Sequence, residues 1–330
     1  MQGKNTTRAM RHPPGALEQR QSLALPQKIR LSERRITAWY NHWQGQVFVA
    51  FSGGKDSTVL LHLVRSRYPE VPAVFYDTGL EFPEIRDFAL SLENVIRVRP
   101  RMSFRQVIEK HGYPVISKRV AQYVKEYQRA AAKGIGQTAT MRLRATGIKS
   151  DGTFSQLGRV PFIHQRLFGA PFKVSDECCH ALKGEPADRY ARESGRYPYV
   201  GTMACESLGR RNEWNENGCN VYDSARPNSK PLSVWTEDDV WAYLRGGNRS
   251  GEQIPYSPIY DNGHRSTGCA FCMFGCHMES SPNRFQVMER THPKLHAYCM
   301  RSREDGGLGL REVLEFIGVP WRNDQMRLFE

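Results

Sequence analysis

The sequence predicts an α/β fold, a doubly wound parallel sheet that binds its ligand beyond the carboxyl ends of the strands. Short apolar runs at 47–51, 73–76 and 94–98 have the length and composition of buried strands. Helical patterns separate these runs, and alternating strands and helices are typical of parallel sheets. Polar turns containing glycine follow two of the runs, at Ser52 and Asp77. We therefore expect both turns at one edge of the sheet.

The elements follow in order along the chain. Residues 27–45 form an amphipathic helix, since Ile29, Ile36, Tyr40 and Trp43 share one face. Pro69 ends the helix that follows the first strand. Thr236 is a helix N-cap with an acidic residue three positions on. The remaining expected elements are a helix at 83–92, basic helical segments with glycine breaks at 112–166, and a strand at 197–202.

Composition suggests three parts and an intracellular setting. We expect a basic flexible tail at 1–26, a nucleotide-binding domain at 27–255 and a smaller cysteine-rich C-terminal module at 256–330. No run of eighteen apolar residues and no apolar N-terminal segment occurs, so a cytoplasmic location with reduced cysteines is expected. The net charge is +13, and Lys118 to Lys149 contains eight Lys/Arg against one acidic residue. Such a segment suits a polyanion such as tRNA or DNA, although a solvated basic helix would look the same.

The turn Ser52-Gly53-Gly54-Lys55-Asp56-Ser57 is the strongest functional signal. A strand, a glycine turn and a helix together aim backbone N–H groups at a phosphate. Two glycines let the backbone approach phosphate oxygens, the serines add hydroxyl donors, and Lys55 adds a point charge. The spacing is not that of a Walker A loop. It predicts a nucleotide site.

A second element of this site is Asp77-Thr78-Gly79. A carboxylate at the end of a strand beside a phosphate loop can hold a metal ion or a ribose hydroxyl. The same residue could also cap the following helix. The neighbouring phosphate loop favours the nucleotide role, so Asp77, Asp56 and Lys55 are the candidate catalytic residues.

Several ordered motifs together resemble the phosphoadenosine phosphosulfate (PAPS) reductase family of PP-loop ATP pyrophosphatases. They are Ser52 to Ser57, Asp77 to Phe82, Gly201 to Ser207 with Arg210 and Arg211, and Pro231 to Trp241. The resemblance implies an adenine nucleotide alpha-hydrolase-like fold that binds ATP, PAPS or adenosine phosphosulfate (APS). It also suggests phosphate contacts for Lys118, in a P-x-x-S-K segment, and for Arg210. Met203 replaces the arginine usual in the family.

The cysteines form a second candidate site. Cys178-Cys179 and the later Cys269-x-x-Cys272 are similar to the [4Fe–4S] pattern of adenylylsulfate-type reductases, and Cys276 is a fifth candidate. Four thiolates suffice, so one cysteine is spare, and the sequence does not say which. Structural zinc is the alternative, and buried unligated cysteines are the third reading.

Two reactions fit these motifs. In the first, ATP is cleaved at its α-phosphate with Mg²⁺ held by Asp56 or Asp77, and a sulfur donor then displaces AMP, with nucleic acid as one acceptor. In the second, a thiolate attacks a sulfonucleotide, and a reductant protein completes the release of sulfite. Reductases of the family carry their nucleophile in a C-terminal Glu-Cys-Gly-Leu-His motif, and no cysteine follows Cys299 here. This favours sulfur transfer over reduction at the level of sequence. A non-catalytic nucleotide-binding partner is the third hypothesis.

Overall fold

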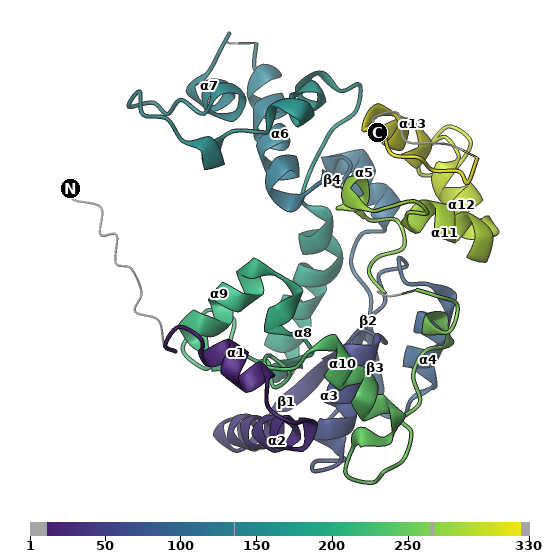
Figure 1. Cartoon of the computed structure of the whole chain (residues 1–330). Helices are drawn as coiled ribbons and strands as arrows, with labels where there is room; N and C mark the ends of the chain where they lie inside the picture. The colour runs from purple at the N-terminus through teal and green to yellow at the C-terminus, as the bar shows by residue number, and fades with distance from the viewer. Residues whose placement is uncertain (1–11, 135, 265–266, 325–330) are drawn as a thin grey trace. The chain divides into compact units, whose positions relative to one another are not determined.

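The computed structural model describes residues 12–134, 136–264 and 267–324 (Figure 1). The chain forms two compact units that are discontinuous in sequence. Unit 1 contains residues up to Asp77, Glu81–Arg99 and Pro186–Thr267, and unit 2 contains Thr78–Leu80, Pro100–Glu185 and Gly268–Glu330. This differs from the expected three-part division, because the basic middle segment joins the cysteine-rich segment in unit 2. Most of the expected tail, residues 1–11, lies outside the described residues.

Unit 1 is built on a mostly parallel sheet of six strands. Its order is β3-β2-β1-β5-β7-β6, and β6 alone runs antiparallel to its neighbour. The strands are β1 (Val47–Phe51), β2 (Ala73–Tyr76), β3 (Val95–Val98), β5 (Tyr197–Val200), β6 (Asn220–Val221) and β7 (Asn228–Ser229). The chain leaves β1 toward β2 on one side and returns to β5 on the other side. The phosphate loop therefore lies at the topological switch point of the sheet, where ligands of such folds bind.

Helices cover both faces of this sheet. Val49 and Phe51 join a core with Trp39 of α2 (Leu25–His42) and Leu60 of α3 (Lys55–Arg65). On the opposite face, the ring of Phe48 lies 5.0 Å from that of Tyr190. The other helical segments of unit 1 are α1 (Ala16–Gln21), α4 (Pro83–Ser91), α8 (Glu185–Ser194), η4 (Ala204–Glu206), α9 (Leu208–Asn217), α10 (Glu237–Ala242), η5 (Tyr243–Gly247) and η6 (Pro258–Tyr260). The predicted doubly wound α/β fold is confirmed.

Unit 2 is mainly helical. Its one short parallel pair joins β4 (Val115–Ile116) to β8 (Met273–Phe274), which brings the basic segment beside the cysteine motif. The helical segments are α5 (Phe104–His111), α6 (Lys118–Ala131), α7 (Ala139–Thr146), η1 (Gln156–Gly158), η2 (Phe162–Gly169), η3 (His180–Gly184), η7 (Cys276–Met278), α11 (Arg284–Thr291), α12 (Pro293–Met300) and α13 (Leu310–Phe316). Among the described residues, no helix combines the length and the apolar character needed to cross a bilayer.

Candidate functional site

Backbone geometry requires glycine at the tip of β1. Gly53 has φ +74°, and a Cβ there would lie 2.8 Å from the carbonyl oxygen of Ile85. A Cβ on Gly54 would lie 2.7 Å from Thr267 Oγ1. Any larger residue at either position would therefore meet protein atoms. The two glycines keep the turn tight at the N-terminus of α3, where backbone N–H groups favour an anion.

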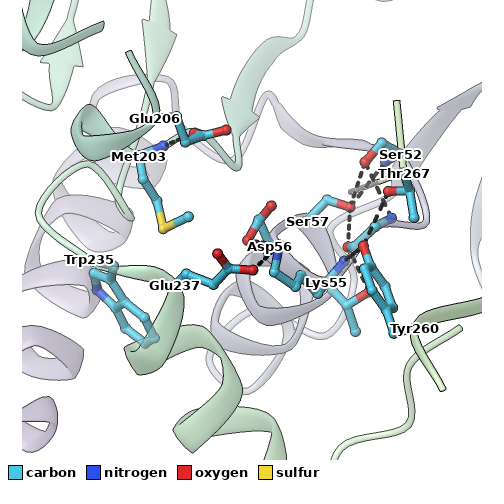
Figure 2. Close-up of polar contacts among 12 residues, drawn as sticks. Ser52, Lys55, Asp56, Ser57, Met203, Glu206, Trp235, Glu237, Tyr260 and Thr267 are labelled. Atoms are coloured by element: carbon cyan, nitrogen blue, oxygen red, sulfur yellow. Dashed lines mark hydrogen bonds and ion pairs between the residues drawn. The ribbon is translucent and has the colours of Figure 1, made fainter. Parts of the chain in front are cut away.

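The two serines of the loop bind each other and the loop backbone. Their hydroxyl oxygens lie 3.0 Å apart, and Ser57 Oγ accepts from the Ser52 amide at 3.2 Å. Ser57 Oγ also lies 2.9 Å from the Gly54 carbonyl oxygen, to which it can donate. Tyr260 OH accepts from the Lys55 amide at 2.8 Å, so this tyrosine covers one amide of the helix start (Figure 2). These contacts of the two serines stabilise the shape of the loop.

Lys55 lies among acidic and aromatic groups (Figure 2). Its Nζ is 3.3 Å from Glu237 Oε1 and 3.7 Å from Asp56 Oδ1, and its side chain is only 8% exposed. Burial by itself lowers the pKa of Lys55, but Asp56, Tyr260 and Glu237 outweigh it and leave the pKa above its ordinary value. Lys55 is thus a permanent positive charge beside the loop.

Asp56 has the opposite balance. Burial raises its pKa; Lys55 opposes this rise, but the nearby carboxylates of Glu206 and Glu237 add to it. Its Oδ1 atom is buried and makes no hydrogen bond. The surroundings therefore stabilise the charged form of Lys55 but destabilise the charged form of Asp56. An under-satisfied carboxylate at this point could accept a further cation.

The block around Met203 forms a wall of this site. The Met203 side chain is buried, and its amide donates to Glu206 Oε2 at 2.6 Å (Figure 2). Arg210 forms an ion pair with the same carboxylate. The arginine expected to contact a phosphate is therefore engaged by Glu206, and a phosphate contact for Arg210 stays a prediction.

Asp77 lies at the end of β2 in a different environment from the one expected. Its buried carboxylate faces three arginines: Arg86 Nε at 3.2 Å, Arg97 in direct contact and Arg99 Nε at 3.8 Å. Three guanidinium groups carry more positive charge than the single carboxylate can neutralise, which makes Asp77 a poor ligand for Mg²⁺ here. Because like charges crowd around a single carboxylate, this sheet edge is cationic.

Thr78 and Gly79 follow in unit 2. Thr78 Oγ1 accepts from the Leu80 amide at 3.1 Å, and Leu80 O accepts from the Ala270 amide at 2.7 Å. Within unit 2, this pairing places Leu80 beside the Cys269-x-x-Cys272 segment. A Cβ on Gly79 would meet nothing within 4 Å, so the glycine is needed only for its φ of +74°.

Lys118 begins α6, and its charge acts on Cys179 within unit 2, while a phosphate contact for Lys118 stays a prediction. Ser117 caps this helix, since its Oγ accepts a hydrogen bond from the Val120 amide at 3.2 Å. The preceding Ile116 has φ +63°, a strained conformation for a β-branched residue. Such strain occurs where surrounding contacts over-determine a position, often near a functional group.

Four cysteines of unit 2 influence one another. Cys178 Sγ and Cys179 Sγ are 4.0 Å apart, and Cys178 also interacts electrostatically with Cys272 and Cys269. A hydrogen bond from Cys178 lowers the pKa of Cys179, and the charges of Lys118 and Lys183 lower it further. This convergence brings together the two cysteine motifs that the sequence singled out.

Cys276 differs from these four. It is fully buried, and its thiol donates to the Met273 carbonyl oxygen at 3.0 Å. Burial raises the pKa of Cys276 to about 12. The pKa of Cys178 is raised as well, by its hydrogen bond with Cys179 and by burial, and burial raises that of Cys272, so Cys276 is set apart by its bond to its own backbone rather than by its pKa. Across the described ranges, no group of three or more Cys, His, Asp or Glu residues is arranged to hold a metal ion.

Sequence reasoning missed several residues of these sites. Tyr260, Thr267 and the arginines around Asp77 carried no local signal, because loop and strand residues gain such roles only from tertiary neighbours. Glu237 was noted only as part of a helix start. A glutamate in the first turn of a helix has a structural explanation of its own, which hid its contact with Lys55.

Comparisons with known proteins agree with these features. Residues 46–148 and 158–274 match the family described as the Phosphoadenosine phosphosulfate reductase domain. An adenosine 5'-phosphosulfate reductase of Lysinibacillus sphaericus is 23% identical over 72% of this chain and 78% of its own length. A phosphoadenosine 5'-phosphosulfate reductase of Xanthomonas axonopodis pv. citri is 23% identical over 72% and 75%.

Other similar proteins are more distant or longer. An uncharacterized protein of Methanocaldococcus jannaschii is 27% identical over 71% of this chain, but the match spans only 37% of that protein. The crystal structure of a phosphoadenylyl-sulfate reductase from Candida auris aligns over 75% of this chain and 96% of its own, with 16% identity and a TM-score of 0.40.

Proposed function

Because this chain belongs to the phosphoadenosine phosphosulfate reductase domain family, we propose that it is an enzyme that releases sulfite from an adenosine 5'-phosphosulfate-type nucleotide. The observation that carries the proposal is the hydrogen-bonded loop Ser52 to Ser57 at the switch point of the sheet. Its backbone and Lys55 would hold the 5'-phosphate. Relatives named as APS and PAPS reductases support this reaction class.

The reaction needs two thiols and proceeds in two displacement steps. A thiolate attacks the sulfonate sulfur, the bond from that sulfur to the phosphate oxygen breaks, and the nucleoside phosphate leaves. A second thiolate then attacks the sulfonated thiol sulfur, so a disulfide forms and sulfite departs. The sulfur of the sulfonate gains the two electrons that the thiols lose. A dithiol reductant protein would supply both thiols.

This chain's own residues would act on the leaving group. Negative charge builds up on the departing phosphate in the transition state, and the largely buried Lys55 would stabilise it. Its raised pKa keeps it charged over the physiological range. The loop amides at the start of α3 would add oriented dipoles.

We further propose that Cys178, Cys179, Cys269 and Cys272 hold a [4Fe–4S] cluster, with Cys276 the spare cysteine. Thiols are the donor type that such a cluster requires, and the charges of Lys118 and Lys183 lower the pKa of Cys179. The four thiols would have to converge further to bind it, because the described residues show no group arranged to hold a metal ion. Zinc is the alternative metal that these thiols could bind. A cluster would supply a redox-active centre. The four thiolates would be its ligands, and the charge of Lys118 would offset part of their negative charge.

ATP-dependent sulfur transfer is the second candidate, and one observation favours it. Asp56 and Glu237 place carboxylates beside Lys55, and Asp56 Oδ1 makes no hydrogen bond. These two residues would hold Mg²⁺ with the phosphates of ATP, whereas a phosphosulfate needs no metal ion.

One experiment separates the two candidates. Anaerobically purified protein is incubated with APS, PAPS or Mg²⁺-ATP and a dithiol reductant, and sulfite and pyrophosphate are measured. Sulfite from a sulfonucleotide, lost in Lys55→Met and retained in the exposed Lys294→Met control, supports the reductase. Pyrophosphate from ATP alone would support sulfur transfer instead, and neither product would overturn both candidates.

A further inference from the structure

Unit 2 exposes an apolar surface that its own packing does not explain. Four side chains, which we call the 154–163 surface, are unusually accessible: Phe154 is 59% exposed, Leu157 70%, Phe162 85% and Ile163 75%. Single exposed apolar residues are ordinary, but two phenylalanines and two aliphatic residues within ten positions are not.

The segments that carry this surface are held in place by α7. Ser155 N donates to Gly147 O at 2.8 Å, and Val160 N donates to Arg144 O at 2.8 Å. Gln165 Nε2 donates to Ala145 O at 2.6 Å, just after the second pair of exposed side chains. Both segments are therefore tied to the last turns of one helix, and α7 itself has no buried residue. The exposed side chains are presented by a fixed scaffold.

The segment that carries these side chains is basic, and one of its arginines lies beside an exposed ring. Residues 118–173 contain eleven Lys/Arg and two acidic residues. The Arg159 guanidinium lies 5.7 Å from the centre of the Phe154 ring, and Lys149 is exposed nearby in sequence. Arg144 stacks 3.7 Å from the centre of the Tyr123 ring while it pairs with Glu126. Aromatic rings and guanidinium planes thus alternate along one basic segment.

We propose that the 154–163 surface binds single-stranded nucleic acid, with Phe154 and Phe162 as stacking platforms and Arg159 as a phosphate or base contact. Exposed rings interleaved with basic side chains are the combination that unpaired bases and their backbone recognise. A duplex offers no free base faces to the rings. A second copy of the chain would bring two strongly positive segments together, which the charge disfavours. This binding is separate from the nucleotide chemistry proposed above for unit 1.

The test is fluorescence anisotropy of the whole chain with a labelled 20-nucleotide oligo-dT, without any mononucleotide. We expect saturable binding that weakens about tenfold in Phe162→Ala and in Phe154→Ala, because each loses one stacked base. Arg159→Gln should weaken binding and lower the slope of log affinity against log salt by about one. Duplex DNA of the same length should bind more weakly.

A matched control is Leu208→Ala, which removes an equally accessible side chain, 71% exposed, from unit 1. Its affinity for the oligonucleotide should equal that of the wild type, and the melting temperatures of all variants should agree. Equal loss in the control, or no loss in Phe162→Ala, would overturn the proposal. Concentration-dependent dimerisation in sedimentation experiments that Phe162→Ala abolishes, without oligonucleotide binding, would show instead that the surface joins two copies. Because no mononucleotide is present, these outcomes are independent of the enzymatic proposal.

Discussion

The phosphate loop of unit 1 and the cysteine centre of unit 2 are assembled in opposite ways. The loop consists of six consecutive residues, and its shape follows from a strand end, two glycines and a helix start. The cysteine centre collects Cys178-Cys179 from one segment, Cys269 and Cys272 from another, and Lys118 from a third. A local motif can be read from the sequence as one unit. For a site assembled from distant segments, the fold determines which residues take part.

Their electrostatics differ as well. In the loop, one lysine lies between the carboxylates of Asp56 and Glu237, so negative charge exceeds positive charge around it. At the cysteines, Lys118 and Lys183 face thiols that are neutral until they lose protons. The first site is therefore expected to tolerate an added cation with its anion. The second is expected to favour deprotonation of Cys179, whereas the pKa values of Cys178 and Cys272 are raised. The following experiments probe this contrast, from the largest expected effect to the smallest.

Gly53→Ala tests whether the loop depends on its local backbone. The new Cβ would lie 2.8 Å from Ile85 O at a φ of +74°, so we expect a loss of roughly 2 kcal/mol in the free energy of unfolding and at least a tenfold loss in nucleotide affinity. Denaturant unfolding and calorimetric titration with adenosine nucleotides measure the two effects.

Gly195→Ala is the matched control in unit 1, because it has φ +66° but no atom within 4 Å of the added Cβ. It should cost about 1 kcal/mol from backbone strain alone and leave nucleotide affinity unchanged. Equal effects of the two substitutions on affinity would mean that close approach at Gly53 is unimportant.

Single alanine substitutions of the cysteines test which of them act together. We expect alanine at Cys178, Cys179, Cys269 or Cys272 to abolish most bound iron and acid-labile sulfide after anaerobic purification. Cys276→Ala should retain both, because its thiol already donates to Met273 O. Cys299→Ala is a close control, since that buried thiol likewise donates to the carbonyl oxygen three residues back, at 3.3 Å. Loss of iron in Cys276→Ala but not in Cys178→Ala would make Cys178 the spare residue, and zinc in place of iron would reject the cluster.

Asp77→Asn tests the cationic sheet edge. Removing the carboxylate leaves Arg86, Arg97 and Arg99 facing one another, so we expect a loss of about 1–2 kcal/mol in stability, reduced by their partial exposure. The double variant Asp77→Asn/Arg97→Gln should recover part of this loss. Unchanged stability, together with activity that no longer depends on Mg²⁺, would instead indicate that Asp77 is a metal ligand.

Asp56→Asn tests the unfavourable carboxylate of the loop. The pKa of Asp56 is raised in the folded state by burial and by Glu206 and Glu237, so its contribution to stability is present at low pH and is lost as pH rises through that pKa. The substitution should therefore stabilise the protein at pH 7 by roughly 0.5–2 kcal/mol, and this gain should shrink as the solution is acidified toward pH 4. Melting curves at several pH values measure it, and a gain that grows on acidification would contradict the assigned direction.

The sequence alone was sufficient for the family, the sheet and the loop. Strands at 47–51, 73–76 and 94–98 were expected from apolar runs and are found at nearly the same bounds. The family suggested by the ordered motifs is confirmed by the match over most of the chain. These features depend on periodicity and turn chemistry over short stretches, which the sequence encodes directly.

Which side chains contact one another became clear only from the folded chain. The sequence could not say that Glu237 would reach Lys55, that three arginines would surround Asp77, or that Cys276 would bond to its own backbone. It also assigned the basic middle segment to the nucleotide-binding domain, whereas the structure joins it to the cysteines. Strand order and crossovers decide which distant residues meet. By itself, then, this sequence determined a glycine turn between a parallel strand and a helix, while the tertiary structure decided which charges surround that turn, because a contact between distant segments has no local signature.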